Sequence, residues 1–138
     1  MTKDSAPLIP RLMLIDDSEI DQMIYARIAR RSGLVGELLQ FHDGTPALSY
    51  LCDTANPRPD LILLDVNMPR MNGFEFLEAA TQTPGLVLSP VVVMLTTSLN
   101  PRDRQRAESF AVVRDFLNKP LTVAHLQSLA ALVGGPGG

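Results

Sequence analysis

The sequence predicts an α/β protein in which five strands and five helices alternate as (βα)₅ around a doubly wound parallel sheet. Short apolar runs rich in Val, Ile and Leu recur along the chain, and segments with helical spacing of apolar residues follow them. The runs are continuously apolar, which is typical of strands covered by helices on both faces. Right-handed crossovers then place helices on both sides of the sheet.

The first predicted strand is the run at residues 12–15. Ser18 is a suitable cap for the helix that follows, whose first turn is acidic, and Gly33 is a plausible end. Helical spacing places four apolar side chains of this segment on one face: Ile20, Met23, Ile24 and Ile28.

The later elements follow the same alternation. A second strand is predicted at 35–41, and Thr45-Pro46 is typical of a helix cap and first helical residue. The third strand, at 61–64, ends at Asp65. The remaining predicted elements are a helix near 74–81, a strand at 91–95, a helix from Pro101 to about 109, a strand at 112–117 and a helix capped by Thr122.

Length and composition indicate one soluble domain. The chain has 138 residues, of which 46% are hydrophobic and 20% charged. We expect this domain to span residues 11–133, between a flexible N-terminus (1–10) and a flexible, glycine-rich tail (134–138).

The same features exclude several classes of partner. The net charge of −3 speaks against a general nucleic-acid binder, and no apolar run reaches the roughly 18 residues that a membrane span needs. The N-terminus lacks the apolar core of a secretion signal, and Cys52 is the one cysteine. We therefore expect a cytoplasmic protein with no nucleic-acid or membrane partner.

Polar residues follow four of the predicted strands. Asp16 and Asp17 follow the first strand, Asp65 the third, Thr96 the fourth and Lys119 the fifth. In open parallel sheets, ligands bind outside the carboxyl ends of the strands, so these side chains are expected at one edge. Each alone has an ordinary interpretation, such as a helix cap or a solvated lysine, and the joint pattern is what indicates a site.

The predicted cluster suits a metal ion and a phosphoryl group. Two carboxylates about 4 Å apart repel by roughly 4 kcal/mol at an effective dielectric constant near 20, so three need a cation or raised pKa values. A set of oxygen ligands favours Mg²⁺ over Zn²⁺. An ammonium and a hydroxyl beside the ion suit an incoming phosphoryl group, and a neighbouring carboxylate can be its nucleophile.

The chain resembles the receiver domain of two-component response regulators over about residues 10–133. The resemblance rests on Leu14-Ile15-Asp16-Asp17-Ser18, on Leu64-Asp65-Val66-Asn67-Met68-Pro69-Arg70-Met71-Asn72-Gly73, on Leu95-Thr96-Thr97 and on Asn118-Lys119-Pro120. It implies a flavodoxin-like, CheY-like sheet with strand order 2-1-3-4-5. No appended output domain is visible, which is similar to the stand-alone, chemotaxis-type members.

The resemblance implies a phosphorylation switch rather than an enzyme. Asp65 would accept phosphate from a phosphohistidine of a sensor histidine kinase. Asp16, Asp17, Asp65 and the backbone carbonyl of Asn67 would hold Mg²⁺ or Mn²⁺, Asp16 mainly through a water. The segments 17–21 and 99–103 are similar to single-domain regulators that are paired with sensor kinases, some of them phytochrome-type.

The remaining motif residues would contact the phosphoryl group or change conformation in response to it. Lys119 would pair with its oxygens, and the backbone of Asn67 and Thr97 would contact it. Thr96 would swing toward it, and Phe116 would move inward in response. This would change the face formed by the fourth helix, fifth strand and fifth helix.

Further expectations concern Pro120 and the fourth helix. The Lys119-Pro120 bond would be cis. Arg102, Arg104 and Arg106 enrich the predicted fourth helix in positive charge, which fits a partner or homodimer face and also an ordinary solvated face. The downstream partner is not identified by the sequence.

Three other functions stay open at this stage. An aspartyl-phosphate phosphatase of the haloacid dehalogenase type usually has a second acid two residues after the nucleophile, where this chain has Asn67. A flavodoxin-like electron carrier would place Asp16-Asp17 against a flavin phosphate and repel it. A receiver that acts mainly as a dimerising scaffold would carry the same motifs.

Overall fold

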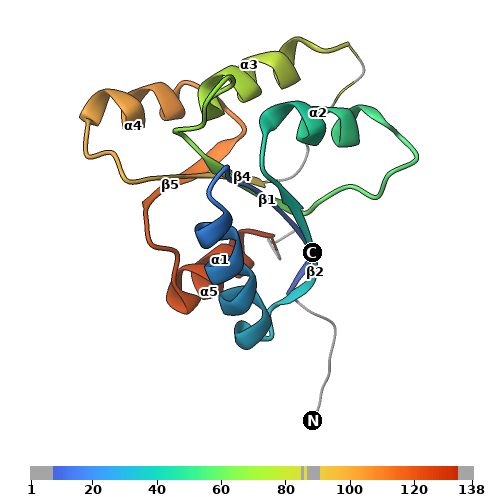
Figure 1. The fold of residues 1–138 in the computed structure, drawn as a ribbon, viewed down its shortest axis with the longest axis vertical. Coiled ribbons are helices and arrows are strands. Elements are labelled where there is room, and N and C mark those ends of the chain that lie inside the picture. The colour runs from blue at the N-terminus through green and yellow to red at the C-terminus, as the bar shows by residue number, and fades with distance from the viewer. Residues whose placement is uncertain (1–7, 85, 87–90, 134–138) are drawn as a thin grey trace.

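The computed structural model describes residues 8–84, 86 and 91–133. Within them, strands and helices alternate along the chain (Figure 1). The elements are β1 (Ile9–Ile15), α1 (Glu19–Ser32), β2 (Val35–Phe41), α2 (Gly44–Cys52), β3 (Leu61–Asp65), α3 (Gly73–Gln82), β4 (Val91–Thr96), α4 (Pro101–Glu108), β5 (Val113–Asn118) and α5 (Val123–Val133).

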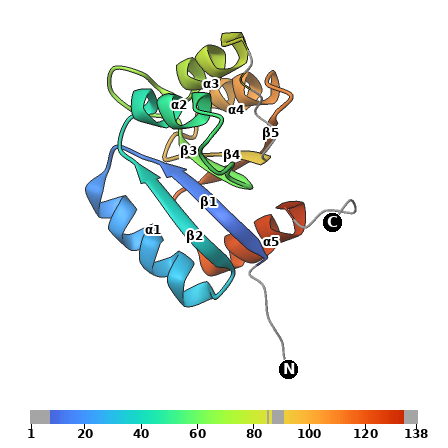
Figure 2. The same cartoon turned by 90° about the vertical axis from the view of Figure 1, so that its right-hand side faces the viewer.

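The strands form one parallel sheet in the order β2-β1-β3-β4-β5. Helices α1 and α5 cover one face, and α2, α3 and α4 cover the other (Figures 1 and 2). The predicted fold class and the strand order implied by the resemblance are thus confirmed. The order changes direction between β1 and β3, so the carboxyl ends of these two strands border the crevice where such sheets bind ligands.

The central strands explain why their sequences are continuously apolar. Every residue of β3 is buried, and successive side chains point to opposite faces. Ile62 and Leu64 join the core beneath α2, α3 and α4. Leu61 and Leu63 join the core beneath α1 and α5. Two apolar layers therefore hold the ends of β1, β3 and β4 in fixed positions at one edge.

Two element boundaries differ from those predicted by more than one residue. Strand β1 begins at Ile9 rather than at residue 12, because the buried Ile9 donates its N–H to the Leu34 carbonyl at 2.8 Å. Helix α2 begins before Thr45, since Asp43 caps it by accepting from the Thr45 N–H at 3.4 Å. The rest of the predicted flexible ends, residues 1–7 and 134–138, lies outside the described residues.

Most of the apolar stripe predicted for the first helix faces the solvent, although its fourth residue, Ile28, is half-buried and packs against the core. Ile20, Met23 and Ile24 are exposed. The buried side consists of Gln22, Tyr25 and Ala29. The rotation of α1 follows from Gln22, whose amide donates to three main-chain carbonyls at the ends of β1 and β2, as detailed below.

Among residues 8–84, 86 and 91–133, the helices are all too short or too polar to cross a bilayer.

Candidate phosphoacceptor and metal site

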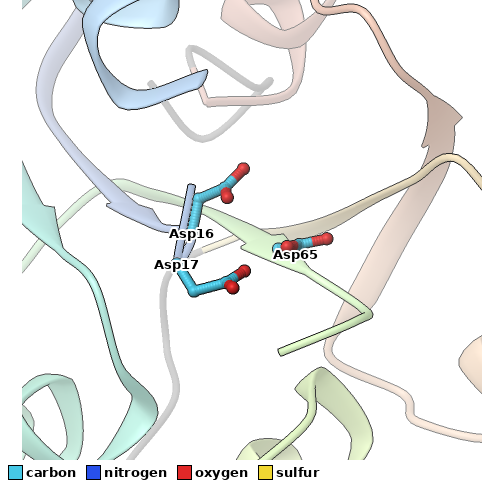
Figure 3. Close-up of side chains that lie close together, drawn as sticks. All are labelled: Asp16, Asp17 and Asp65. Atoms are coloured by element: carbon cyan, nitrogen blue, oxygen red, sulfur yellow. The ribbon is translucent and has the colours of Figure 1, made fainter. Parts of the chain in front are cut away.

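Three aspartates meet at the carboxyl ends of β1 and β3. Asp16 and Asp17 directly follow β1, and Asp65 is the last residue of β3. Each offers a carboxylate oxygen, and these oxygens all lie within 4.8 Å of one another (Figure 3). Asp16 and Asp65 are 0% and 4% exposed, whereas Asp17 is open to solvent. The structure therefore brings together the three carboxylates that the strand-end pattern selected.

The turn after β3 requires a glycine. The Gly73 N–H donates to the Val66 carbonyl at 2.9 Å, which folds the start of α3 back onto the end of β3. A Cβ atom at this position would lie 2.6 Å from the Asp65 carbonyl oxygen. Gly73 thus allows the backbone contact that fixes Asp65. The Asn67 N–H also donates to the Asp65 Oδ1 atom, at 3.3 Å.

Lys119 brings a positive charge from the end of β5. Its Nζ atom lies 2.9 Å from Oδ2 of Asp16, 2.7 Å from Oδ2 of Asp21 and 3.6 Å from Oδ1 of Asp65. Its backbone N–H donates to the Thr96 carbonyl at 2.8 Å, which ties it to β4. The Lys119–Pro120 peptide bond is cis.

The pKa values of Asp65 and Lys119 are both raised above their usual values, for different reasons. Burial, and then the Asp16 charge, raise the pKa of Asp65 to about 7, although Lys119 and the Asn67 N–H counteract this. Burial lowers the pKa of Lys119, but hydrogen bonds to Asp16 and Asp21 outweigh it, so that this pKa is raised above its usual value. Lys119 is therefore fully charged, while Asp65 holds a proton easily when no divalent metal ion is bound.

The hydroxyl of Thr96 is already engaged. Thr96 is the last residue of β4 and is 0% exposed. Its Oγ1 atom accepts from the Asn67 side-chain amide at 3.2 Å and from the Ser98 N–H at 2.9 Å. In both bonds Thr96 is the acceptor, so its own O–H remains available to donate to a group on Asp65.

The ring of Phe116 on β5 is buried and lies against α4. It is 7% exposed, and the Arg104 guanidinium carbon lies 5.4 Å from the ring centroid. Arg104 also donates to the Phe116 carbonyl at 3.2 Å. Arg106 lies 4.6 Å from the centroid of the Phe74 ring. Two of the three arginines on this helix therefore cover aromatic rings.

Two residues of the site were not selected from the sequence. Asp21 contacts Lys119, as described above, and the Gln22 amide donates to the carbonyls of Leu14 (3.4 Å), Asp16 (3.0 Å) and Phe41 (2.9 Å). In sequence, Asp21 is an acid in the first turn of a helix, which the helix dipole explains by itself. Gln22 carries no pattern that distinguishes it from a surface glutamine.

The carboxylate cluster fits a hard divalent cation. Its ligands are oxygens, two of the three carboxylates are buried, and one has a pKa raised partly by its neighbour. Such a cluster is relieved by a dication, which Mg²⁺ or Mn²⁺ would provide while keeping several waters. Asp17, being exposed, leaves the site open toward solvent.

Comparison with known proteins identifies the family. The family model described as "Response regulator receiver domain" matches residues 12–131. The chain belongs to this family. The motif resemblance is thereby confirmed, and the family is one of signalling modules rather than of conventional enzymes. This membership decides against the phosphatase and flavodoxin alternatives.

Named relatives are similar over most of the domain. The response regulator Rcp1 of Synechocystis sp. is 38% identical over 96 residues, which are 67% of this chain and 65% of Rcp1. A two-component response regulator from Cytophaga hutchinsonii superposes with a TM-score of 0.81 at 32% identity, covering 91% of this chain and 96% of that one.

Two solved structures also inform the site. The Mn²⁺-bound form of Rcp1 matches with a TM-score of 0.70 at 32% identity and covers 91% of this chain and 90% of that one. The phosphorylated cyanobacterial phytochrome response regulator RcpA matches with a TM-score of 0.70 at 30% identity, covering 92% and 90%. The acidic cluster and the Mn²⁺-bound relative together indicate a divalent-cation site.

Proposed function

We propose that this protein is a cytoplasmic response regulator that accepts a phosphoryl group from a sensor histidine kinase on Asp65. The observation that carries the proposal is the position of Asp65, buried at the end of β3 with two more carboxylates within 4.8 Å and the Lys119 ammonium at 3.6 Å. A carboxylate that neighbours both an acidic metal cluster and a fixed cation is suited to nucleophilic attack on phosphorus.

The transfer exchanges one phosphorus bond for another. A carboxylate oxygen of Asp65 forms a bond to phosphorus as the bond between phosphorus and the kinase histidine nitrogen breaks. The electron pair of the broken bond returns to the imidazole, which then takes a proton from solvent. Lys119 neutralises charge on the phosphoryl oxygens, and the backbone N–H groups of Asn67 and Thr97 donate to them.

Asp16, Asp17, Asp65 and the Asn67 carbonyl would hold Mg²⁺ in this protein. When bound, the ion offsets the negative charge of the cluster and of the phosphoryl group. Because the pKa of Asp65 is about 7 without the ion, Asp65 needs positive charge beyond that of Lys119 to be fully ionised at neutral pH. We do not regard the protein as an enzyme, since its own side chain is the group that is modified.

The output face would be formed by α4, β5 and α5. A phosphoryl group on Asp65 would draw the Thr96 hydroxyl from Asn67, and Phe116 and Arg104 would respond at the α4–β5 surface. The phytochrome-related regulator RcpA among the similar structures supports a phytochrome-type kinase as the donor.

Phosphorylation of purified protein tests this proposal. The protein would be incubated with acetyl phosphate and Mg²⁺, and intact-mass spectrometry would measure the adduct before and after hydroxylamine. We expect a hydroxylamine-labile phosphoryl adduct on wild-type protein, none on Asp65→Asn, and much less in EDTA.

Asp60→Asn is a matched control, because Asp60 precedes the opposite end of the same strand and accepts the Arg11 N–H there at 2.9 Å. It should be phosphorylated like the wild type. Equal labelling of wild type and Asp65→Asn would refute Asp65 as the acceptor.

A further inference from the structure

Lys119 is held most closely by a residue outside the acidic cluster. Its Nζ atom lies 2.7 Å from Oδ2 of Asp21, compared with 2.9 Å from Asp16 and 3.6 Å from Asp65. An ammonium has three N–H donors, and carboxylates other than Asp65 accept two of them. The distance to Asp65 exceeds that of a hydrogen bond. The Lys119 ammonium is therefore turned toward Asp21 on α1 and away from Asp65, where a phosphoryl group would need it.

The two carboxylates that hold Lys119 differ in position. Asp16 is fully buried, and its second oxygen accepts the Ser18 N–H at 2.9 Å, so it is fixed within the cluster. The Asp21 side chain is 27% exposed and lies in the first turn of α1, at the rim of the site. Water can replace Lys119 as a partner of Asp21 but not of Asp16. Asp21 is therefore the contact that can be broken and remade.

We propose that Asp21 is a positioning residue that holds Lys119 back from Asp65 and competes with phosphoryl oxygens for it. This inference rests on the proposed function. When a phosphoryl group occupies Asp65, Lys119 turns to its oxygens and leaves Asp21 for solvent. The Asp21 charge then opposes the added anion. Asp21 thus weakens phosphoryl binding and sets how readily the switch turns on.

Beryllofluoride, which stands for a phosphoryl group on the acceptor carboxylate, gives a direct affinity measurement. Wild type, Asp21→Asn and Asp65→Asn would be titrated calorimetrically at saturating Mg²⁺. The Asn side chain keeps the size and acceptor oxygen of Asp21 but removes its charge. We expect Asp21→Asn to bind beryllofluoride about three- to tenfold more tightly than wild type.

Two variants separate this role from a general effect of charge or helix stability. Glu19→Gln removes an exposed acid from the same first turn of α1 and should change the affinity less than twofold. Asp21→Glu restores the charge and should return the affinity toward that of wild type. Asp21 and Glu19 both stabilise the N-terminus of α1 through its dipole. Glu19→Gln therefore controls for any loss of helix stability in Asp21→Asn.

The ion pair itself can be observed without a ligand. The chain contains two lysines, Lys3 and Lys119, so the side-chain ¹⁵N spectrum holds two ammonium signals, and Lys3→Arg assigns them. A paired ammonium exchanges its protons slowly. The Lys119 signal should be sharp in wild type and Glu19→Gln, and should shift and broaden in Asp21→Asn.

The outcomes distinguish the two proposals. If wild type fails to bind beryllofluoride, or binds it no better than Asp65→Asn does, the proposed function fails and this inference with it. If wild type binds in an Asp65-dependent manner but Asp21→Asn changes affinity no more than Glu19→Gln, this inference alone is wrong. Weaker binding by Asp21→Asn would also overturn it, because Asp21 would then be preparing Lys119 for the phosphoryl group.

Discussion

Replacing Asp65 with Asn should stabilise the folded protein at neutral and alkaline pH when divalent cations are absent. Burial and the Asp16 charge raise the pKa of Asp65 from 3.8 to about 7. A shift of about three pKa units corresponds to about 4 kcal/mol, and each unit to roughly 1.4 kcal/mol. Because the site opens to water at the sheet edge, which screens part of the penalty, we expect a gain of about 2–4 kcal/mol at pH 8.

The sign of the pH dependence follows from the raised pKa. Between about pH 4 and pH 7, the folded state holds the Asp65 proton and the unfolded state releases it. The Asp65 contribution to stability is therefore fully present below pH 4, declines as the pH rises to 7, and stays lost above it. Asp65→Asn lacks this decline, so its advantage over wild type should be near zero at pH 4 and complete by pH 8.

Urea unfolding in EDTA, followed by circular dichroism from pH 4 to pH 8, measures this difference. Glu108→Gln, at an exposed position of α4, should show no such pH-dependent gain. Adding Mg²⁺ should shrink the gap at pH 8, since the ion binds only the folded wild type with its full carboxylate set. A gap that stays constant across this pH range, or a less stable Asp65→Asn at pH 8, would refute the reasoning.

Two substitutions test how the surrounding structure supports the site. Gly73→Ala would place a Cβ atom 2.6 Å from the Asp65 carbonyl oxygen and should cost about 1–3 kcal/mol of unfolding free energy in urea; an unchanged midpoint would show that this turn yields freely. Arg104→Ala removes the guanidinium above Phe116 and its bond to the Phe116 carbonyl, and should cost about 0.5–1.5 kcal/mol in the same assay. Arg102→Ala, at an exposed position of the same helix, should stay within about 0.5 kcal/mol of wild type.

Local sequence patterns sufficed for the strands and for the membership of the acidic cluster. Apolar runs marked the strands because a buried parallel strand is apolar on both faces, as β3 is. Asp16, Asp17 and Asp65 were identifiable because chain position at a strand end already implies the edge of the sheet. Element boundaries that depend on single hydrogen bonds, such as the start of β1 at Ile9, could not be predicted from these patterns.

The orientation of α1 shows where periodicity is insufficient. Ile20, Met23 and Ile24 have the spacing of a buried stripe, yet they face solvent. The helix is fixed instead by Gln22, which donates to carbonyls at the ends of β1 and β2, the strands on either side of α1 in the sequence. A local sequence pattern cannot predict these hydrogen bonds, because the acceptor carbonyls come into place only when the strands pair.

The sequence by itself determined the alternating fold and the strand ends that carry Asp65 and its neighbouring acids, because both are properties of residue order. Only the tertiary structure decided which charged groups lie close enough to interact. Lys119 reaches Asp21 across 98 residues of chain because the end of β5 and the start of α1 lie at the same edge of the sheet. Interaction between charges depends on distance in space, and that distance exists only once the sheet has assembled.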